Sequence, residues 1–477
     1  MTHERLLAGN PVTSLEQWID HGGGQGLDAA RRMGSEALLA TVEASGLRGR
    51  GGAGFPTATK WRTVLQHRSE DLSTPVVVNA AEGEPGTFKD RTILRHNPYQ
   101  LVEGALVAAS AVSADWIIFG LKTSFEKEFT GLRRAIDEIT AAGWADGITI
   151  DVKEGPGAYL YGEETALLEV IDGREPFPRV APPWRQGVDE VANPGEVPPT
   201  LVNNVETLSN LPGIAAHGPE WFRGCGTEKS PGTIVCTISG AVLRDAVGEI
   251  PMGTSLRDAI HIVSGGPRKD REIVAVLGGV TNAILTAAQL DVPLTYEDMA
   301  AIGSGLGSCG FLVFDDDTDF VAVAHGVARF LAVESCGQCT PCKDDGKSIA
   351  AGLDRIRRSD AEPDDLEIVL EKLETVTDGA RCFLAQQHQT VVRSIITAFQ
   401  GQFRAHEDGA IEPADTFPIA EILDLQGESV LIDDHQLRKQ PDWTYNDVDS
   451  GASPSDLIDV RADDAGDAGA IDETSGD

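Results

Sequence analysis

Basic residues, aromatic residues and long apolar runs are all scarce in this sequence of 477 residues. Lys and Arg number 39 against 75 Asp and Glu, which gives a formal net charge of −36, and only 11 of the basic residues are Lys. Such an acidic chain argues against nucleic acid as a partner, because binding to phosphates needs clustered basic residues. Many carboxylates with few lysines are typical of halophilic proteins, in which salt screens repulsion over roughly 3 Å. An acidic protein of a mesophile is the alternative interpretation.

The lack of long apolar runs excludes a transmembrane helix, which needs about 20 consecutive apolar residues. The longest candidate, residues 101–121, is interrupted by Glu103 and Asp115. The first residues also lack the basic-then-apolar pattern of a signal peptide. We therefore expect a cytoplasmic protein with no direct membrane insertion, and in that compartment we expect no disulfides among its seven cysteines.

Strand-like and helix-like segments alternate in the first half of the sequence. Strands are predicted over residues 74–80, 115–121 and 147–155, and helices over residues 35–44, 57–67, 98–112, 125–142 and 163–171. This alternation predicts an α/β domain with a mostly parallel sheet, which binds ligands at the carboxyl ends of its strands. We assign residues 31–231 to this domain and expect residues 1–30 to be irregular.

The pattern changes from residue 232 onward. Short strands around one helix, which begins at a Ser255–Asp258 capping box and ends at Gly265, predict a small α+β module over residues 232–320. A helical, cysteine-rich region is expected over residues 321–402. The remaining residues, 403–477, form a C-terminal extension with a predicted hairpin at 419–434 and an acidic, low-complexity tail that we expect to be disordered.

The stretch "LRGRGGAGFP" contains a G-x-G-x-x-G pattern over residues 49–54. A Rossmann loop with this pattern follows a strand, whereas the segment before this one is predicted to be helical. A helix does begin after it, near Thr57, and backbone N–H groups beside a helix N-terminus bind anions. Arg50 and Lys60 add positive charge, so the stretch predicts an anion site. A solvated hinge is the alternative for this glycine cluster taken alone.

Two further loops combine glycines with carboxylates at the ends of predicted strands. "NAAEGEPGTFKDR" carries Glu82 and Glu84, and "GPGAYLYGEETALLE" carries Glu163 and Glu164 at the start of a helix. Carboxylates can accept hydrogen bonds from a ribose or a ring N–H. For Glu82 and Glu84 the structural alternative is a polar turn with a solvated face. For Glu163 and Glu164 it is the favourable interaction of carboxylates with a helix N-terminus. Three such loops at one edge of a sheet favour a ligand site.

The cysteine spacing is the most specific feature of the sequence. Cys336, Cys339 and Cys342 form a C-x₂-C-x₂-C pattern, and Cys382 follows downstream. Three closely spaced thiolates and a remote fourth are typical ligands of a [4Fe–4S] cluster. A structural zinc site is the alternative, although such sites more often use two separated C-x₂-C pairs. The other three cysteines stand alone in the sequence and are expected to be buried apolar residues.

Five motifs together resemble the NADH-binding flavoprotein subunit of respiratory complex I and the related diaphorase subunits of NAD-linked hydrogenases and formate dehydrogenases. They are "GLRGRGGAGFPTATKW", "NAAEGEPGTFKDR", "GAYLYGEETALLE", "LVNNVETLSNLP" and "SCGQCTPC". The resemblance spans about residues 35–400. It implies a Rossmann-like FMN domain, a ubiquitin-like module and a helical domain that carries one [4Fe–4S] cluster.

The resemblance also implies an activity, in which NADH gives a hydride to FMN and electrons leave singly through the cluster to other subunits of a redox complex. We expect these partners to be a small [2Fe–2S] subunit and a larger iron–sulfur subunit. A diaphorase subunit of a soluble, NAD-linked formate dehydrogenase or hydrogenase is the alternative function. A zinc-stapled interaction module without redox activity is the alternative of another class.

By the same resemblance, individual residues receive roles. The FMN phosphate and ribityl chain would be held by Gly49, Arg50, Gly51, Gly52 and Lys60. The rest of the flavin site would be lined by Asn79, Glu82, Tyr159, Gly162, Glu163, Val202, Asn203, Asn204 and Thr207. NADH would contact Phe55, Glu84, Glu164 and Trp184. The cluster would be bound by Cys336, Cys339, Cys342 and Cys382. No side chain would act as acid or base, because the cofactors carry the hydride transfer.

The sequence departs from the family pattern at four places. Ala81 stands where the family has Asp, Tyr161 where it has Cys, and Ala58 where it has Gly. The family's "KPPF" becomes "APPW" at residues 181–184, which removes a Lys near the nucleotide and exchanges one aromatic residue for another. Ala81 removes one hydrogen bond to flavin or nucleotide. The missing Lys predicts weaker NADH binding or a different electron donor.

Overall fold

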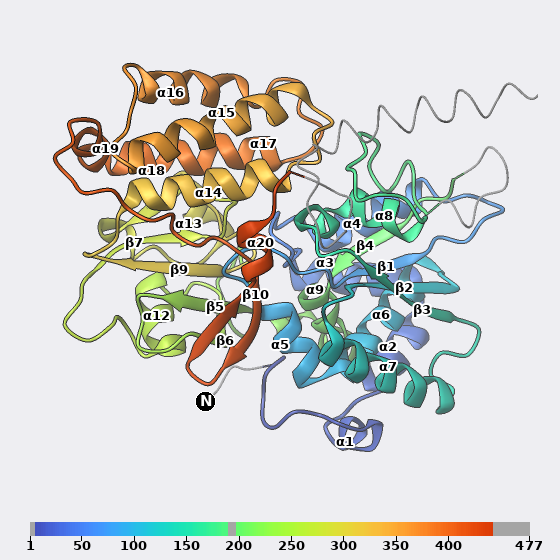
Figure 1. The fold of residues 1–477 in the computed structure, drawn as a ribbon. Coiled ribbons are helices and arrows are strands. Elements are labelled where there is room, and N and C mark those ends of the chain that lie inside the picture. The colour runs from blue at the N-terminus through green and yellow to red at the C-terminus, as the bar shows by residue number, and fades with distance from the viewer. Residues whose placement is uncertain (1–4, 189–196, 442–477) are drawn as a thin grey trace, which may run out of the picture. The chain divides into compact units, whose positions relative to one another are not determined.

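The computed structural model describes residues 5–188 and 197–441, and the chain divides into two compact units (Figure 1). The first comprises Met1–Thr318 with Ala420–Asp433, and the second comprises Asp319–Ile419 with Asp434–Asp477. The acidic tail expected from the sequence lies outside the described residues. Within them, no helix has both the length and the apolar character that crossing a membrane requires.

A four-stranded parallel sheet forms the centre of the first unit's N-terminal part (Figure 1). Its strand order is β3 (Thr149–Gly155), β2 (Trp116–Lys122), β1 (Val76–Asn79) and β4 (Leu201–Asn204). Alternate residues of β1 enter two different apolar cores, as the two-residue period of a strand requires. Val76 and Val78 pack in the core that contains α6 (Pro98–Val112), whereas Val77 packs with α8 (Glu164–Ile171). Burial on both faces explains the unbroken apolar run in this strand.

The other helices of this part surround the sheet and its connecting loops. They are α1 (Leu15–Asp20), α2 (Gln25–Met33), α3 (Ser35–Ser45), α4 (Thr57–Gln66), α5 (Lys89–His96), α7 (Glu126–Ala141), α9 (Val205–Ser209), α10 (Leu211–His217) and α11 (Pro219–Arg223). The five helices and three strands predicted here are confirmed. The expectation that residues 1–30 are irregular is wrong, because Ser14 caps α1 and α2 packs on α6 and α10. Strand β4 and helices α5, α9, α10 and α11 were not predicted from the sequence.

A smaller α+β module completes the first unit. Its mixed sheet has the order β6 (Ala246–Pro251), β5 (Thr233–Gly240), β9 (Gly310–Asp315), β7 (Ile273–Gly278) and β8 (Leu285–Thr286). Helix α12 (Leu256–Ser264) packs its apolar side into the core of this module, and a short α13 (Tyr296–Ala301) precedes β9. Ser255 accepts a hydrogen bond from the Asp258 N–H, and Gly265 ends α12 with a φ of +84°, so the predicted cap and stop are both confirmed.

The second unit is helical, as the sequence predicted. Its helices are α14 (Phe320–Glu334), α15 (Thr340–Arg357), α16 (Asp365–Thr375), α17 (Leu384–Gln387), α18 (Arg393–Ala398), α19 (Gln400–Glu407) and α20 (Asp434–Arg438). One π-helical turn, His388–Val392, joins α17 to α18.

The predicted hairpin is confirmed and belongs to the first unit. Strands β10 (Ile422–Gln426) and β11 (Ser429–Ile432) pair antiparallel around a turn at Gly427, whose φ is +64°. The chain therefore leaves the first unit after residue 318, forms most of the second unit, and returns to the first unit for these few residues.

Candidate functional site

A cavity of about 500 Å³ lies at the carboxyl ends of β1 and β4 in the first unit. The last residue of each strand, Asn79 and Asn204, lines it, and the two residues are direct partners across the parallel pair. Asn203 lines it as well. This is the edge of the sheet at which parallel α/β domains bind their ligands.

The cavity brings together twelve of the eighteen residues predicted to bind cofactor. These are Gly49, Gly51, Phe55, Lys60, Asn79, Gly162, Glu164, Trp184, Val202, Asn203, Asn204 and Thr207. They come from segments that are far apart in the sequence, and four of the five motifs contribute. The expectation that the loops share one sheet edge is therefore confirmed.

The glycine stretch forms a closed loop between α3 and α4. The Gly49 N–H donates to the Phe55 carbonyl at 2.8 Å, which holds the two ends of the loop together. Gly54 has a φ of +61°, and a Cβ atom added there would lie 2.3 Å from the ring of Tyr296. Only glycine fits at this position, because both the backbone conformation and the space exclude a side chain.

The N-terminus of α4 faces the cavity with unused hydrogen-bonding capacity. Thr57, the first residue of the helix, lines the cavity, and its buried hydroxyl has no hydrogen-bond partner among the described residues. Leaving such a group unsatisfied costs about 1–3 kcal/mol, so a ligand that reaches it gains affinity. Lys60 lies one turn further along the same helix, and its ammonium pairs with Glu164 at 2.7 Å. A helix N-terminus with a lysine beside it suits a phosphate.

Three asparagine amides of the cavity wall are held in fixed orientations. Asn79 Nδ2 donates to the Gly162 carbonyl at 2.8 Å, and Asn203 Oδ1 accepts from Trp61 Nε1 at 2.8 Å. Asn204 Nδ2 donates to a carboxylate of Asp90 at 2.6 Å. Asn79 Oδ1 also accepts from the Ala81 N–H at 3.2 Å, and Asn204 Oδ1 from the Glu206 N–H at 3.0 Å. Because these contacts fix the amides, the donors and acceptors that remain have defined directions for a ligand.

Six residues predicted to bind cofactor do not line the cavity: Arg50, Gly52, Glu82, Glu84, Tyr159 and Glu163. Arg50 departs furthest from its predicted role in holding the phosphate. Its guanidinium is buried and donates to the Tyr296 hydroxyl at 2.9 Å and the Thr233 carbonyl at 3.1 Å. Only its backbone contributes to the glycine loop, since the charge is directed into the protein.

Two of the predicted flavin-site carboxylates cap helices instead. Glu163 accepts hydrogen bonds from the Thr165 N–H at 3.0 Å and from the next N–H of α8 at 2.9 Å. Glu82 accepts from the Asp90 N–H of α5 at 2.9 Å and pairs with Arg91 at 3.1 Å. The helix-dipole alternative considered for Glu163 therefore describes that residue well. The solvated turn considered for Glu82 is wrong, because its side chain is only 3% exposed and pairs with Arg91.

Glu84, predicted to contact NADH, joins the first sheet to the α+β module. Its carboxylate accepts from the Tyr159 hydroxyl at 2.5 Å, the Thr281 hydroxyl at 2.7 Å and the Val280 N–H at 2.7 Å. Burial raises the pKa of Glu84 above its usual value, while these three hydrogen bonds oppose the shift. Tyr159, predicted to line the flavin site, is engaged in the same contact.

Four residues that sequence reasoning did not assign also line the cavity: Ala53, Gly54, Thr57 and Thr63. Two of these residues, Thr57 and Thr63, could have been predicted from their spacing of three residues from Lys60. Residues three apart lie on the same side of a helix, so a lysine assigned to the site implies that its neighbours at these intervals share its environment.

The predicted cluster ligands are placed around the start of α15. Cys336 follows α14, Cys339 is the residue before α15, and Cys342 lies in the first helical turn. Burial raises the pKa of the Cys336 thiol and raises that of Cys342 to about 11, and the charges of the three sulfurs influence one another. A hydrogen bond of 3.4 Å from Gln338 Nε2 to Cys336 Sγ opposes the rise in the pKa of Cys336.

Cys382 lies two residues before α17, a helix that packs on α15. No three side chains of His, Cys, Asp or Glu within residues 5–188 and 197–441 are arranged around a common metal position. The four-cysteine ligand set therefore stays a prediction. The seven cysteines are free thiols in the structure. Cys236 and Cys309 are buried in the core of the α+β module, as expected, whereas Cys225 is only partly buried, so that expectation is wrong for it.

Comparisons with known proteins agree with this arrangement. Residues 42–213 match the Nuo51 FMN-binding domain, and residues 322–406 match the NADH-ubiquinone oxidoreductase-F iron-sulfur binding region. The NADH-quinone oxidoreductase F 2 protein of Rhizobium meliloti (strain 1021) is 36% identical over 380 residues, which are 78% of this chain and 89% of that protein. The chain belongs to the NADH-quinone oxidoreductase F family.

This member of the NADH-quinone oxidoreductase F family is also similar to proteins of hydrogenases. The NADP-reducing hydrogenase protein HndC of Solidesulfovibrio fructosivorans is 35% identical over 412 residues, 84% of this chain and 82% of that protein. The crystal structure of an NAD⁺-reducing [NiFe]-hydrogenase in the H₂-reduced state superposes with a TM-score of 0.74 at 35% identity. The match covers 86% of this chain and 69% of that one. The resemblance inferred from the five motifs is confirmed.

The residues of this family member fit the cofactors of its two matched domains, FMN and a [4Fe–4S] cluster. For FMN, the buried Thr57 hydroxyl, which has no partner among the described residues, and Lys60 would suit a phosphate at the N-terminus of α4. A Cβ atom on Gly51 would lie 3.2 Å from Asn204 Cβ, so the absence of side chains keeps the cavity open there. For the cluster, closely spaced thiols with a hydrogen-bond donor at Cys336 are a suitable donor set.

Proposed function

We propose that this chain oxidises NADH at the cavity between the glycine loop and the ends of β1 and β4. It would pass the electrons through the iron–sulfur region to partner subunits. When bound, FMN supplies acceptance of a hydride and release of single electrons, and the cluster supplies one-electron transfer. The observation that carries the proposal is the cavity itself, because it gathers twelve residues that the family resemblance assigned independently of any structure.

The side chains divide the work of binding between them. Lys60, the Thr57 hydroxyl and the loop amides would hold the FMN phosphate, and the fixed amides of Asn79, Asn203 and Asn204 would orient the rest of the flavin. Phe55 lines the cavity and is 53% exposed, so its ring offers a flat surface on which a nucleotide base can stack. Trp184 provides a second aromatic surface in the same lining.

The partners and location follow as further proposals. The named relatives belong to NADH-quinone oxidoreductases and to a hydrogenase, so we expect a small [2Fe–2S] subunit and a larger iron–sulfur subunit as partners. We place the chain in the cytoplasm, where it would reach the membrane face only through such partners.

HndC and the hydrogenase structure favour a second candidate, a diaphorase subunit of a soluble hydrogenase or formate dehydrogenase. Purification from the native source with its partners distinguishes the two by the subunits recovered.

The test is spectroscopic. The full chain, reconstituted anaerobically with FMN, iron and sulfide, is expected to bind about four iron atoms and to show flavin absorbance that NADH bleaches. Cys339→Ala should remove the broad iron–sulfur absorbance and leave the flavin bound. The matched control Cys225→Ala replaces a cysteine outside the pattern and should retain both. A colourless chain that binds zinc in place of iron would contradict the proposal.

A further inference from the structure

Behind the cavity, the first unit contains a continuous series of buried charges. Four cations and four carboxylates make up this buried ionic chain: Arg50, Glu206, Lys89, Asp90, Glu82, Arg91, Glu421 and Lys122. No side chain in it is more than 7% exposed. The formal charges cancel, as burial at this depth requires.

The first half of the buried ionic chain runs from the glycine loop to α5. Arg50 Nε lies 3.9 Å from a carboxylate oxygen of Glu206, and Lys89 Nζ lies 2.9 Å from the other oxygen. Lys89 also pairs with Asp90 at 2.7 Å. The Asp90 N–H then donates to Glu82 at 2.9 Å, which joins this half to the next.

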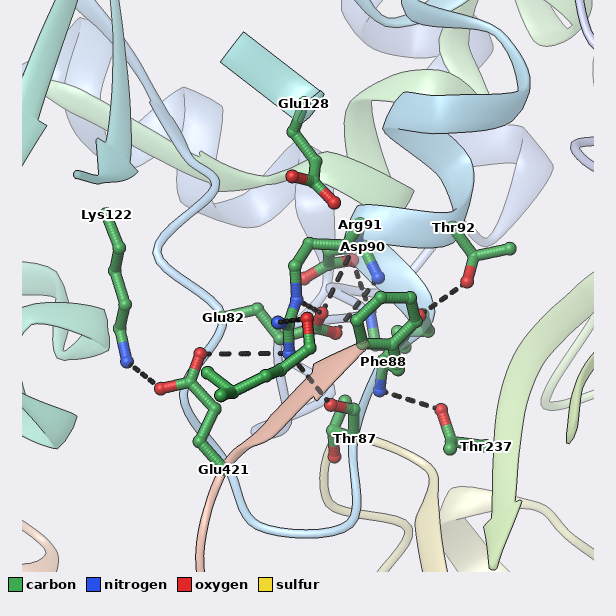
Figure 2. Close-up of polar contacts among 12 residues, drawn as sticks. Glu82, Thr87, Phe88, Asp90, Arg91, Thr92, Lys122, Glu128, Thr237 and Glu421 are labelled. Atoms are coloured by element: carbon green, nitrogen blue, oxygen red, sulfur yellow. Dashed lines mark hydrogen bonds and ion pairs between the residues drawn. The ribbon is translucent and has the colours of Figure 1, made fainter. Parts of the chain in front are cut away.

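The second half runs from α5 to the C-terminal hairpin. Figure 2 shows Arg91 between Glu82 and Glu421, with Lys122 reaching Glu421 from β2. Arg91 is 3.1 Å from Glu82 and 3.7 Å from Glu421, and Lys122 is 2.5 Å from Glu421. Glu421 immediately precedes β10, so the hairpin contributes one of the four negative charges.

The buried ionic chain touches the cavity at two lining residues. Asp90 accepts the 2.6 Å hydrogen bond that orients the Asn204 amide. At the other end, the Arg50 N–H donates to the Thr207 hydroxyl at 2.8 Å, while the Arg50 guanidinium, which also donates to Tyr296, lies 3.9 Å from Glu206 of the ionic chain. The directions of a cavity amide and of the glycine loop thus depend on where these buried charges lie.

Glu421 is the member on which the charge balance depends most. Among the described residues it is the only carboxylate that pairs with Lys122, whose other contact is the Gly157 carbonyl at 3.3 Å. Removing the Glu421 charge leaves the fully buried Lys122 ammonium unpaired and gives the buried ionic chain one excess positive charge. A buried ion without a partner is strongly unfavourable, so neighbouring groups move to compensate.

We propose that Glu421 is a positioning residue for the FMN site. By neutralising Lys122 and Arg91, this residue of the C-terminal hairpin keeps the buried ionic chain in place. The buried ionic chain in turn holds Asn204 and the glycine loop in the arrangement that retains FMN. The inference rests on the proposed function, in that FMN occupies the cavity. It assigns to a segment that follows the iron–sulfur region in the sequence a role in the flavin site of the first unit.

The hairpin provides its own control in Asp424. This residue lies three positions from Glu421 and also pairs with two cations, Arg95 at 2.5 Å and Lys127 at 2.6 Å. Its side chain is 22% exposed and Lys127 is 67% exposed, so solvent can compensate the loss of this charge. Asp424→Asn therefore perturbs the docking of the hairpin without leaving a buried ion unpaired.

The experiment measures the dissociation constant of FMN from the full chain by the fluorescence of released flavin. Glu421→Gln should raise it about fivefold or more, and Asp424→Asn should leave it within about twofold of the native value. Lys122→Met creates the opposite imbalance and should also weaken FMN binding. The double variant Lys122→Met/Glu421→Leu removes both charges and should return the constant to within about twofold of the native value.

Each outcome decides the inference. Glu421→Gln that binds FMN as the native chain does would overturn it. So would a double variant as weak as the single variants, because loss of packing and not of charge balance would then be responsible. If Glu421→Gln does not fold, the dissociation constants of FMN from Lys122→Met and from the double variant are compared instead, and the same outcomes decide. A native chain that fails to bind FMN would instead overturn the proposed function.

Discussion

Lys60 is the only cation among the described residues that line the cavity. In a chain with a net charge of −36, a phosphate must be bound against an unfavourable overall field, so the local donors have to suffice. Arg50, the other cation of the glycine stretch, directs its charge to Glu206 and Tyr296 inside the protein. At the scale of single residues, the proposed function thus assigns the electrostatic part of phosphate binding to Lys60 and a neutral hydrogen bond to Thr57.

We expect Lys60→Met to weaken FMN binding about tenfold to a hundredfold, which corresponds to loss of one charge-assisted hydrogen bond. The replacement also leaves Glu164 without its cation. Fluorescence titration of the apoprotein with FMN measures the effect, and Lys60→Arg is the control because it keeps the charge. An equal affinity in Lys60→Met and the native chain would place the phosphate elsewhere.

Two helices near the cavity differ in how their N-termini are satisfied. The side chain of Glu163 caps α8 with two backbone hydrogen bonds, whereas the residue before α4, Pro56, provides no side-chain cap. The Thr57 N–H donates to the Leu47 carbonyl at 3.1 Å, so the next N–H groups of this first turn are the ones that can serve a ligand. At the scale of elements, the structure therefore separates a helix that the protein completes by itself from one that a phosphate can complete.

We expect Glu163→Ala to lower the free energy of unfolding by about 1–2 kcal/mol, since it removes the N-terminal cap of α8. FMN affinity should change much less than in Lys60→Met. Thermal or chemical unfolding measures the first effect and flavin titration the second. The control Glu126→Ala, at an exposed first-turn position of α7, should cost less than about 1 kcal/mol. A large loss of FMN binding with unchanged stability would support the direct flavin contact that the family resemblance assigned to Glu163.

At the scale of the whole molecule, the acidic surface and the buried charges behave differently. The buried ionic chain is neutral, so the excess of negative charge lies on other carboxylates, most of which are not buried among the described residues. Mutual repulsion of these carboxylates destabilises the compact state and is screened by salt. The proposal that the chain is adapted to high salt rests on this excess and on the small number of lysines.

We expect the melting temperature of the cofactor-loaded chain to rise as KCl is increased from about 0.1 M to about 2 M, because the Debye length falls from about 10 Å to less than about 3 Å. Circular dichroism at a series of salt concentrations measures this. Sodium sulfate at matched ionic strength separates screening from salting-out of apolar surface. A melting temperature that is constant or falls with KCl would favour the alternative, an acidic protein of a mesophile.

The sequence by itself determined the features that depend on residues close together along the chain. The alternation of apolar segments predicted the parallel sheet and five of the eleven helices α1–α11, and Ser255 with Gly265 marked the ends of α12. The glycine spacing predicted an anion loop beside a helix start. The cysteine spacing predicted an iron–sulfur region, and the comparisons bear this out. These features were accessible because hydrogen bonding and side-chain periodicity act over a few residues.

Only the tertiary structure decided where the predicted charged side chains point. Arg50 turns to Tyr296, Glu84 to Val280, and Lys122 to Glu421, and each partner lies more than a hundred residues away in the sequence. A carboxylate in a glycine-rich loop has the same local sequence whether it meets a ligand or a helix N-terminus. Its role is set by which cation or N–H group the fold brings within about 3 Å, because burial penalises any charge left without one.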